Sequence, residues 1–374
     1  MKKVVRIIVK IFIVILVIAL GVYGFTKVYP SFGASPSAKM RKDYQKRASN
    51  FDGKSFHNTG SFKLMEAPGK GKKNHFVSKK GATPEKRLTA LKPDLLSGEA
   101  LKKSKDFSVT WFGHSTLLIQ MHGMNILIDP IFSERSSPFQ FVGTKRFSDL
   151  PMTIKQLPKI DVVLFSHDHM DYLDYDTILQ LDHKVKRYVV PLGIESDLER
   201  WHVSSKKITN MAWWEETKVD GLTIGCTPAR HYSGRGRDDR YKTLWCSWVL
   251  KDADHQIYES GDTGYGSHFK EIHKKYGDFD FALVDCAQYD ALWPDVHMFP
   301  EQAFKAVEEL GAKQAMPIHF GTFKLANHPW DDPVVRFVNA AKGSDVTIST
   351  PRIGETMVLS KIKNYQHRWY ESIK

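Results

Sequence analysis

The stretch Ser166–Ile178 reads SHDHMDYLDYDTI and directly follows the apolar, β-branched run IDVVLF at Ile160–Phe165. A short run of this kind predicts a buried strand, so the polar stretch begins where the strand ends. In α/β sheets, ligands bind at the carboxyl ends of strands. His167, His169 and Asp171 lie within five residues there, and imidazole together with carboxylate suits zinc and neighbouring transition metals. The stretch therefore predicts a metal site at the edge of an α/β sheet.

Three further residues of ligand type follow other predicted strands. His231 comes after LTIGCTPAR, Asp262 after HQIYESG and His319 after AKQAMPI. Strand-end positions would bring all three to the same edge of the fold as His167. A single histidine such as His231 or His319 is more often an ordinary hydrogen-bonded residue. Three residues of ligand type clustered in HDHMD more often mark a metal site.

The cysteines exclude other kinds of metal site. The chain of 374 residues has three of them, Cys226, Cys246 and Cys286, and no pair has zinc-finger spacing. This spacing fits neither a disulfide framework nor a thiolate metal site. Any metal is therefore held by His, Asp or Glu, and 16 histidines are available.

The formal net charge of +12 comes largely from basic runs before residue 106, such as SAKMRKDYQKR and GKGKKNHFVSKK. Runs of this kind are usually solvated linkers with little order. The functional alternative is attraction to an anionic membrane surface or to an anionic substrate such as a phosphodiester. We do not expect nucleic acid as a partner, because no basic motif interleaved with aromatic residues is present.

The N-terminus carries a candidate membrane anchor. The basic stretch MKKVVRIIVK precedes IFIVILVIALGVYGF at Ile11–Phe25, which has no charged residue. If Lys10 snorkels, the apolar span extends to Ile7–Phe25, near the usual spanning length of about 20 residues. A cleaved signal peptide is the alternative, but the following FGASPSAKM has neither a convincing A-x-A site nor a lipobox cysteine. We expect a single-pass N-terminal anchor in the cell membrane, and basic residues on both flanks leave its orientation open.

From Phe107 onward, short strands alternate with turns and, late in the chain, with helices. FSVTWFGHSTLLIQ and MNILIDP predict a hairpin with MHGM at its turn. PEQAFKAVEELG predicts a helix that starts with Pro300 and ends at Gly311 as its C-cap. Together these patterns predict a mixed α/β domain.

Six motifs in this part of the chain resemble those of a known family. They are, in order, TWFGHSTLLI, IDPIFSERSSP, SHDHMDYLDY, PARHYSGR, SGDTGY and PIHFGTF. In this order they resemble the metallo-β-lactamase fold superfamily, and more narrowly its N-acyl-phosphatidylethanolamine-hydrolysing phospholipase D branch with its bacterial relatives. The match runs from roughly Phe51 to Gly354. The resemblance implies a four-layer αββα sandwich with a two-metal site at one edge.

Carried over position by position, the resemblance implies two metal sites that share one aspartate. The family pattern H-x-H-x-D-H falls on His167, His169 and Asp171. The implied ligands of site one are His167, His169, His231 and Asp262, and those of site two are Asp171, Asp262 and His319. The implied cofactor is one or two Zn²⁺ ions, with Mn²⁺ and iron as alternatives.

Tyr172 stands where the family pattern has its last histidine. A phenol has a pKa of about 10 and is a poor ligand unless the metal ionises it. Tyr172 either binds the second metal as a phenolate, or leaves that site weakly occupied with water in the gap, or marks a degenerate site. We favour a weak second site, because every other ligand position is filled.

The resemblance also implies hydrolysis by a metal-bound hydroxide formed between two cations. Asp171 and Asp262 would hold and orient this nucleophile. His297, in DVHMFPEQ, matches a histidine near the site in the phospholipase branch, and we expect it to contact the substrate phosphate or to protonate the leaving group. Its plainer role is that of a surface histidine at a helix entry. His114 in GHST and Asp129 in IDP are expected to support the ligands or to be purely structural.

The expected function is that of a phosphodiesterase of the phospholipase D type, acting at the membrane on N-acylated or other phospholipids. The alternative within the superfamily is a lactonase or other hydrolase of small esters, and the alternative of another class is a catalytically degenerate, membrane-bound binding protein. A nuclease is disfavoured, because no RNA-gripping arm is visible. We expect an anchor over residues 1–25, a basic linker and lead-in segment over 26–105 and a hydrolase domain over 106–374, with the oligomeric state left open.

Overall fold

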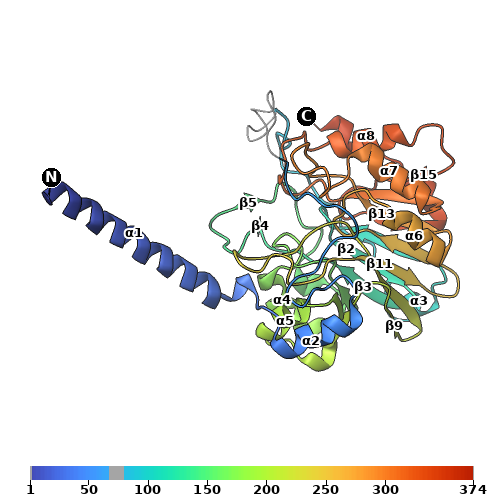
Figure 1. The fold of residues 1–374 in the computed structure, drawn as a ribbon. Helices are drawn as coiled ribbons and strands as arrows, with labels where there is room; N and C mark the ends of the chain where they lie inside the picture. Colours follow the sequence, from blue (N-terminus) through green and yellow to red (C-terminus); the bar gives the residue numbers. More distant parts are fainter. Residues whose placement is uncertain (1, 67–79, 374) are drawn as a thin grey trace.

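Two β-sheets, each with seven strands in the part of the chain that the structure describes, form the body of the molecule (Figure 1). The structure is a computed structural model, and it describes residues 2–66 and 80–373. The strands of the first sheet, in spatial order, are β16 (Thr356–Val358), β1 (Ser108–Trp111), β2 (Leu117–Met121), β3 (Met124–Ile128), β6 (Ile160–Leu164), β7 (Val185–Pro191) and β8 (Ile208–Met211). Antiparallel pairs join β16, β1, β2 and β3, and parallel pairs join β3, β6, β7 and β8.

The second sheet repeats this mixture of antiparallel and parallel pairs. Its strands, in spatial order, are β15 (Thr347–Ile348), β14 (Gln314–Ile318), β13 (Phe281–Asp285), β12 (Gln256–Glu259), β11 (Ser247–Lys251), β10 (Leu222–Thr227) and β9 (Glu216–Val219). The pairs from β9 to β12 are antiparallel, and those from β12 to β15 are parallel. The predicted α/β fold is therefore confirmed, with two mixed sheets.

The alternation of side chains along the strands divides the core into layers. Leu117 and Ile119 of β2 belong to the main core, to which both sheets contribute, whereas Leu118 between them belongs to a second core on the outer face. The predicted hairpin is confirmed: β2 and β3 pair antiparallel, with His122 and Gly123 at the turn. The strand predicted directly before the histidine motif is β6.

Helices cover the outer faces of both sheets (Figure 1). On the first sheet, α4 (Tyr175–Leu181) and α5 (Ile194–Arg200) contribute Ile178 and Leu198 to the outer core. The helices on the second sheet are α6 (His268–Tyr276), α7 (Pro300–Glu309) and α8 (Asp332–Ala340). The helix predicted from Pro300 is α7, and Gly311 follows its end with a left-handed φ of 64°. Two shorter elements complete the domain, namely α3 (Gly98–Lys103) and the two-stranded sheet of β4 (Arg135–Ser136) and β5 (Thr144–Lys145).

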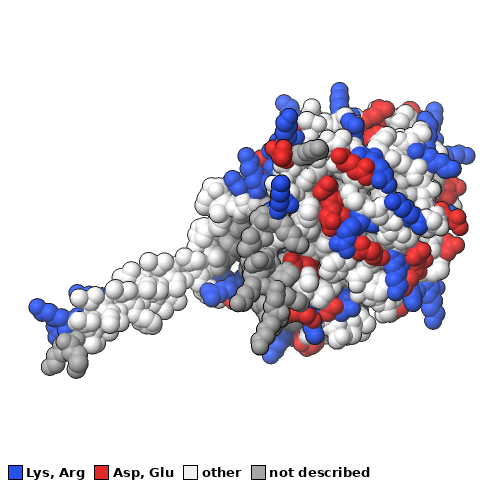
Figure 2. All heavy atoms as spheres, turned by 90° about the horizontal axis from the view of Figure 1, so that it is seen from above, with Lys and Arg blue, Asp and Glu red and all other residues white. Residues whose placement is uncertain are grey.

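The apolar N-terminal segment forms one long helix, α1 (Lys2–Val28), that projects from the body of the molecule (Figure 1). Its residues Lys3–Val28 have a mean hydropathy of 2.9 in the most apolar window, and none of that window is buried. Figure 2 shows the helix without charged side chains along most of its length, with lysine and arginine at its free end. The helix is long and apolar enough to span a membrane, and a signal sequence would have the same features.

The segment that directly follows this helix packs against the domain. It contains a 3₁₀ turn, η1 (Pro30–Phe32), and the helix α2 (Ala38–Arg47). Tyr44, Phe51 and Phe56 form a small core with residues of the domain such as Leu192 and Trp245. Much of the later basic run GKGKKNHFVSKK lies outside the described residues. The described first part of the predicted linker therefore has an ordered structure of its own.

Candidate metal centre

The ends of four strands bring the residues of ligand type to one edge of the molecule. His167 and His169 follow β6, His231 follows β10, Asp262 follows β12 and His319 follows β14. Three groups of side chains there offer ligand atoms that all lie within 4.8 Å of one another. The first group is His167, His169, His231 and Asp262, the second is His114, Asp171 and His319, and the third is Asp262, Asp285, His297 and His319.

The first group has the geometry of a tetrahedral metal site. His167 Nε2 lies 2.9 Å from His169 Nδ1, which lies 3.3 Å from His231 Nε2. Asp262 Oδ2 lies 3.5 Å from His167 Nε2 and 3.6 Å from His231 Nε2. Four ligands at about 2.0–2.1 Å from a zinc ion would be separated by roughly 3.3–3.4 Å. These four atoms therefore surround a space of the size that one zinc ion needs.

The surroundings of these ligands fix which ring nitrogens face that space. His231 Nδ1 donates to the Val296 carbonyl at 3.1 Å, so Nε2 carries the free lone pair. His167 Nδ1 pairs with Ser166 Oγ at 2.9 Å. Gly261, with a φ of 54°, lets the backbone before Asp262 pass close to Ser166, because a Cβ there would lie 2.7 Å from the Ser166 Cβ. Partners of this kind orient the ligands of protein metal sites.

A second group lies beside the first, with Asp262 close to both. His114 Nε2 donates to Asp171 Oδ2 at 2.8 Å, and the rings of His114 and His319 are 4.5 Å apart. The two histidines are also joined through the main chain: His114 N donates to the Phe320 carbonyl and His319 N to the His114 carbonyl, both at 2.9 Å. This main-chain bridge ties the loop after β1 to the loop after β14. Within the described residues, His114 Nδ1 and His319 Nε2 have no hydrogen-bond partner.

Tyr172 occupies the inner side of this second group. Its buried hydroxyl makes a short hydrogen bond to Asp262 Oδ1, and it lies 2.7 Å from both His319 Nδ1 and Ser115 Oγ. Burial, together with the charges of Asp262 and Asp171, raises the pKa of the Tyr172 phenol well above its usual value. Before any metal binds, the hydroxyl is therefore a hydrogen-bond donor to Asp262.

His297 lies beside both groups and is paired with a carboxylate that the sequence analysis did not single out. Its Nδ1 donates to Asp285 Oδ2 at 2.9 Å, and its ring stacks on that of His319 at 5.0 Å. Asp285 ends strand β13, so the rule that identified Asp262, a carboxylate at the end of a predicted strand, also applies to it. His297 is mostly buried, which disagrees with a surface role.

The electrostatics of the metal-free centre favour binding of a cation. Burial and neighbouring imidazoles hold the pKa values of His167 and His231 well below the usual value, and burial lowers the pKa of His169 to about 4. These rings are therefore neutral near pH 7 and able to bind a metal. Burial and the charges of Asp285 and Asp171 raise the pKa of Asp262 well above its usual range. A metal cation would relieve this repulsion among carboxylates.

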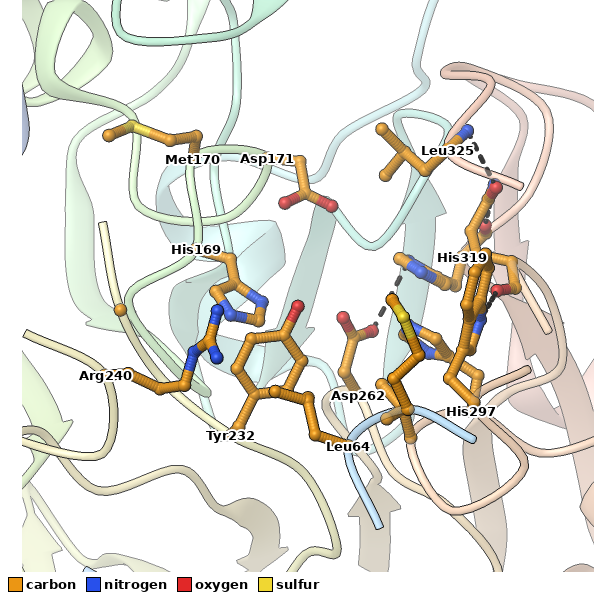
Figure 3. A pocket seen from close by; sticks show the side chains of 15 residues that line it. Leu64, His169, Met170, Asp171, Tyr232, Arg240, Asp262, His297, His319 and Leu325 are labelled. Carbon is orange, nitrogen blue, oxygen red and sulfur yellow. Dashed lines mark hydrogen bonds and ion pairs between the residues drawn. The ribbon is translucent and has the colours of Figure 1, made fainter. Parts of the chain in front are cut away.

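The centre opens into a cavity of about 440 Å³ (Figure 3). Asp171 and His169 lie on one side of it, and Asp262, His297 and His319 lie on the other. The remaining wall is mainly apolar with one arginine, and its residues include Leu64, Met65, Met170, Tyr232, Arg240, Trp293 and Leu325. Of these, Trp293 carries an indole Nε1 that donates to the Gln288 carbonyl at 2.9 Å. A substrate in this cavity would therefore meet both ligand-type residues and apolar side chains.

Two mixed sheets with buried His and Asp groups at one edge define a metal-dependent hydrolase. The family model described as a beta-lactamase superfamily domain matches residues 124–320, a little over half of the chain. The chain therefore belongs to the metallo-β-lactamase superfamily, as its motifs predict. Solved structures agree at the level of the fold: Igni18, a metallo hydrolase of Ignicoccus hospitalis, has 22% sequence identity and a TM-score of 0.53, and the match covers 68% of this chain and 98% of that one.

Three individual proteins are also similar to the chain in sequence. An uncharacterised protein of Mycobacterium tuberculosis is 40% identical over 276 residues, which are 73% of each chain. The N-acyl-phosphatidylethanolamine-hydrolyzing phospholipase D 1 of Caenorhabditis elegans is 32% identical, over 58% of this chain and 64% of that protein. The mitochondrial enzyme of that name in Saccharomyces cerevisiae is 31% identical, over 66% of this chain and 55% of that protein. The predicted resemblance is confirmed, although the match spans less than two thirds of the length of either phospholipase.

Proposed function

We propose that this protein is a membrane-anchored phosphodiesterase of the phospholipase D type that hydrolyses N-acylated or other phospholipids. The observation that carries the proposal is the cavity, because ligand-type residues and apolar side chains line it together. A phospholipid combines the same two kinds of group, a charged phosphodiester and long acyl chains. Arg240 at the wall supplies a positive charge suited to the phosphate. The similarity to two phospholipases of this type supports the same substrate class.

We assign zinc to the first site, held by His167, His169, His231 and Asp262, because three imidazoles and one carboxylate with these separations suit zinc. Asp171, Asp262 and His319 would hold a second ion, and His114 lies close enough to complete that site. Metals bound in such a pair attract the substrate's phosphate oxygens and lower the pKa of water to about 7.

The residues around the site then have distinct tasks in the hydrolysis. Asp171 and Asp262 orient the attacking water, whose oxygen forms a bond to phosphorus as the bond from phosphorus to the headgroup oxygen breaks. His297 protonates the departing headgroup oxygen through Nε2, since its Nδ1 is committed to Asp285. The products are a phosphatidic acid and a free headgroup. The apolar wall holds the acyl chains and keeps the phosphodiester at the metal end.

The helix α1 would serve as the anchor that keeps this cavity at a membrane. Its 27 residues extend for about 40 Å, enough to cross the hydrocarbon core of a bilayer, which is about 30 Å thick. The apolar surface of the helix is fully exposed in the structure, so a membrane is its natural surrounding.

The proposal is tested with the full chain purified in detergent. Metal content is measured per chain, and hydrolysis is followed with an N-acylphosphatidylethanolamine in mixed micelles, with bis(p-nitrophenyl) phosphate and with an N-acylhomoserine lactone. We expect bound zinc and release of phosphatidic acid, with both lost in Asp262→Ala. Lactone opening without phosphodiester cleavage would instead identify a lactonase, and metal-reconstituted protein inert on all three substrates would identify a binding protein.

A further inference from the structure

A short apolar loop stands out on the surface beside the base of α1. It connects β4 to β5, and its residues Phe141 and Val142 have 82% and 52% of their surface exposed. The ring of Phe139 lies 5.4 Å from that of Phe141 and stacks on it. We call Phe139, Phe141 and Val142 the aromatic lip. A phenylalanine this exposed gains no free energy from burial of its ring unless something covers it.

The aromatic lip is continuous with the end of the apolar helix. The ring of Phe139 lies 6.0 Å from that of Phe25 and 5.0 Å from that of Tyr29. Phe25 lies in the last turns of α1, and Tyr29 follows it. Aromatic residues at the ends of membrane-spanning helices lie at the level of the lipid headgroups. When α1 spans a bilayer, the aromatic lip therefore lies at the same level as the helix end.

The helix end is fastened to the domain at several points, so this arrangement is not a loose contact. Lys27 Nζ forms an ion pair with Asp238 at 3.2 Å. Arg200 Nη2 donates to the Val28 carbonyl at 2.9 Å. Trp201 Nε1 donates to the Pro30 carbonyl at 2.8 Å. With the helix held in this way, the domain has little freedom to turn its aromatic lip away from the bilayer.

A further contact of the segment after α1 reaches the loop that carries the histidine motif. The buried Arg235 donates to the Ser31 carbonyl at 2.7 Å and, with its other amino group, to the carbonyls of Asp168 and Leu173 at 2.6 Å. Asp168 and Leu173 lie in the loop that carries the histidine motif. The chain just after the aromatic lip also contacts a loop that lines the cavity, since Arg146, directly after β5, lies over the ring of Phe323 at 4.9 Å. Two residues further on, Leu325 lines the cavity.

We propose that the aromatic lip inserts into the headgroup region of the same bilayer that α1 spans and so fixes the domain in one orientation at the membrane. The cavity mouth is then held close to the lipid surface, and a phospholipid needs to rise only a short way out of the bilayer to reach it. This inference rests on the anchoring role proposed for α1. It adds a second, independent membrane contact to that role.

The test uses single cysteines introduced into the full chain and labelled with an environment-sensitive fluorophore. The native Cys226, Cys246 and Cys286 are buried, so the introduced residue is labelled selectively. The three positions are Phe141→Cys in the aromatic lip, Ile15→Cys in the middle of α1, and Lys342→Cys, an exposed site two residues after α8. Figure 1 shows α8 on the other side of the domain from α1. The protein is placed in phosphatidylcholine vesicles that contain lipids with a nitroxide at headgroup or acyl-chain depth.

We expect strong quenching at position 141 by headgroup nitroxides, quenching at position 15 by acyl-chain nitroxides, and none at position 342. Quenching at position 15 but not at 141 would contradict insertion of the aromatic lip into the headgroup region and would leave the anchoring role of α1 supported. No quenching at position 15 would overturn both. As a functional readout, Phe141→Asp should slow hydrolysis of phospholipid in vesicles by about ten-fold and leave hydrolysis of bis(p-nitrophenyl) phosphate unchanged. An equal loss on both substrates would also contradict the proposal.

Discussion

The two halves of the candidate metal centre share Asp262 but differ in how fully the chain builds them. In the first half, three imidazoles and one carboxylate offer ligand atoms that all lie within 4.8 Å of one another, and four of the pairs are 2.9–3.6 Å apart. In the second half, a phenol hydroxyl forms hydrogen bonds to two of the groups that would bind the metal, Asp262 and His319. A metal in the second half competes with the Tyr172 hydroxyl for Asp262 Oδ1, although His319 Nε2 has no hydrogen-bond partner among the described residues and is free to bind it. The ligand atoms of the first half face no such competitor.

Because of this difference, the two halves need not bind a metal ion with the same affinity, even though they share a ligand. Tyr172 gains three hydrogen-bond partners when no second metal is present, which stabilises the vacant arrangement. His114 on the other side of the second half offers a fourth ligand or a hydrogen bond to Asp171. We therefore expect one tightly bound metal and one that binds more weakly.

The largest expected effect comes from removing the residue that the halves share. Asp262→Ala should weaken both metals and lower phosphodiester hydrolysis by more than about 100-fold, since loss of an outer partner alone costs 10–100-fold. Zinc titration by calorimetry and steady-state kinetics measure the two effects. Unchanged binding of one metal in this variant would show that Asp262 belongs to one half only.

The next largest effect is expected from replacing His114, which lies in the second half of the centre. His114→Ala should weaken the second metal by about 10–100-fold and leave the first unchanged, whether His114 binds the metal or holds Asp171. The main-chain bridge to Phe320 does not involve the side chain, so the fold should persist, which circular dichroism checks. If the first metal is lost instead, the two halves are not separable in this way.

Replacing Tyr172 tests whether its phenol weakens metal binding in the second half. Tyr172→His restores an imidazole and should tighten the second metal by about ten-fold, a smaller effect because the new ring must fit a space shaped for a phenol. Tyr172→Phe is the matched control, because it removes the hydroxyl but keeps the ring, and it should leave the second metal bound. Loss of that metal in Tyr172→Phe would identify the tyrosine as a phenolate ligand.

The last effect concerns the stability of the metal-free protein rather than its affinity for metal. Burial and the charge of Asp171 raise the pKa of Asp129 to about 8. The folded state then keeps a proton that the unfolded state loses near pH 4, so this group makes stability fall as pH rises from about 4 to about 8, by about 1.4 kcal/mol per pH unit. Asp129→Asn should remove that slope in chemical denaturation of the metal-free protein. An unchanged slope would show that Asp129 is ionised throughout.

The first half of the centre could be predicted because its information is local. His167 and His169 stand two positions apart in the sequence, and the strand before them is a largely apolar run. The strand-end rule then led to His231, Asp262 and His319, and the structure brings all of them together. The same rule would have found Asp285, which ends β13, but no metal pattern in the neighbouring sequence drew attention to it.

The second half could not be predicted in the same way, because its geometry depends on contacts between distant parts of the chain. The hydroxyl of Tyr172 meets Ser115 and His319, which are 204 residues apart. The segment after α1 shows a similar limit. Its basic composition predicts a linker, but Tyr44 and Phe51 pack against the domain, and an average over composition does not reveal a few well-placed aromatic residues.

The main-chain bridge between His114 and the loop at Phe320 also bears on how the protein is made. The first of these loops emerges early in synthesis, and its partner emerges only when most of the domain has been translated. The nascent chain therefore carries the histidine motif for a long interval before the remaining ligands exist. The second site is therefore completed only after the loop at Phe320 has been made, whereas the four ligands of the first site all precede it in the chain.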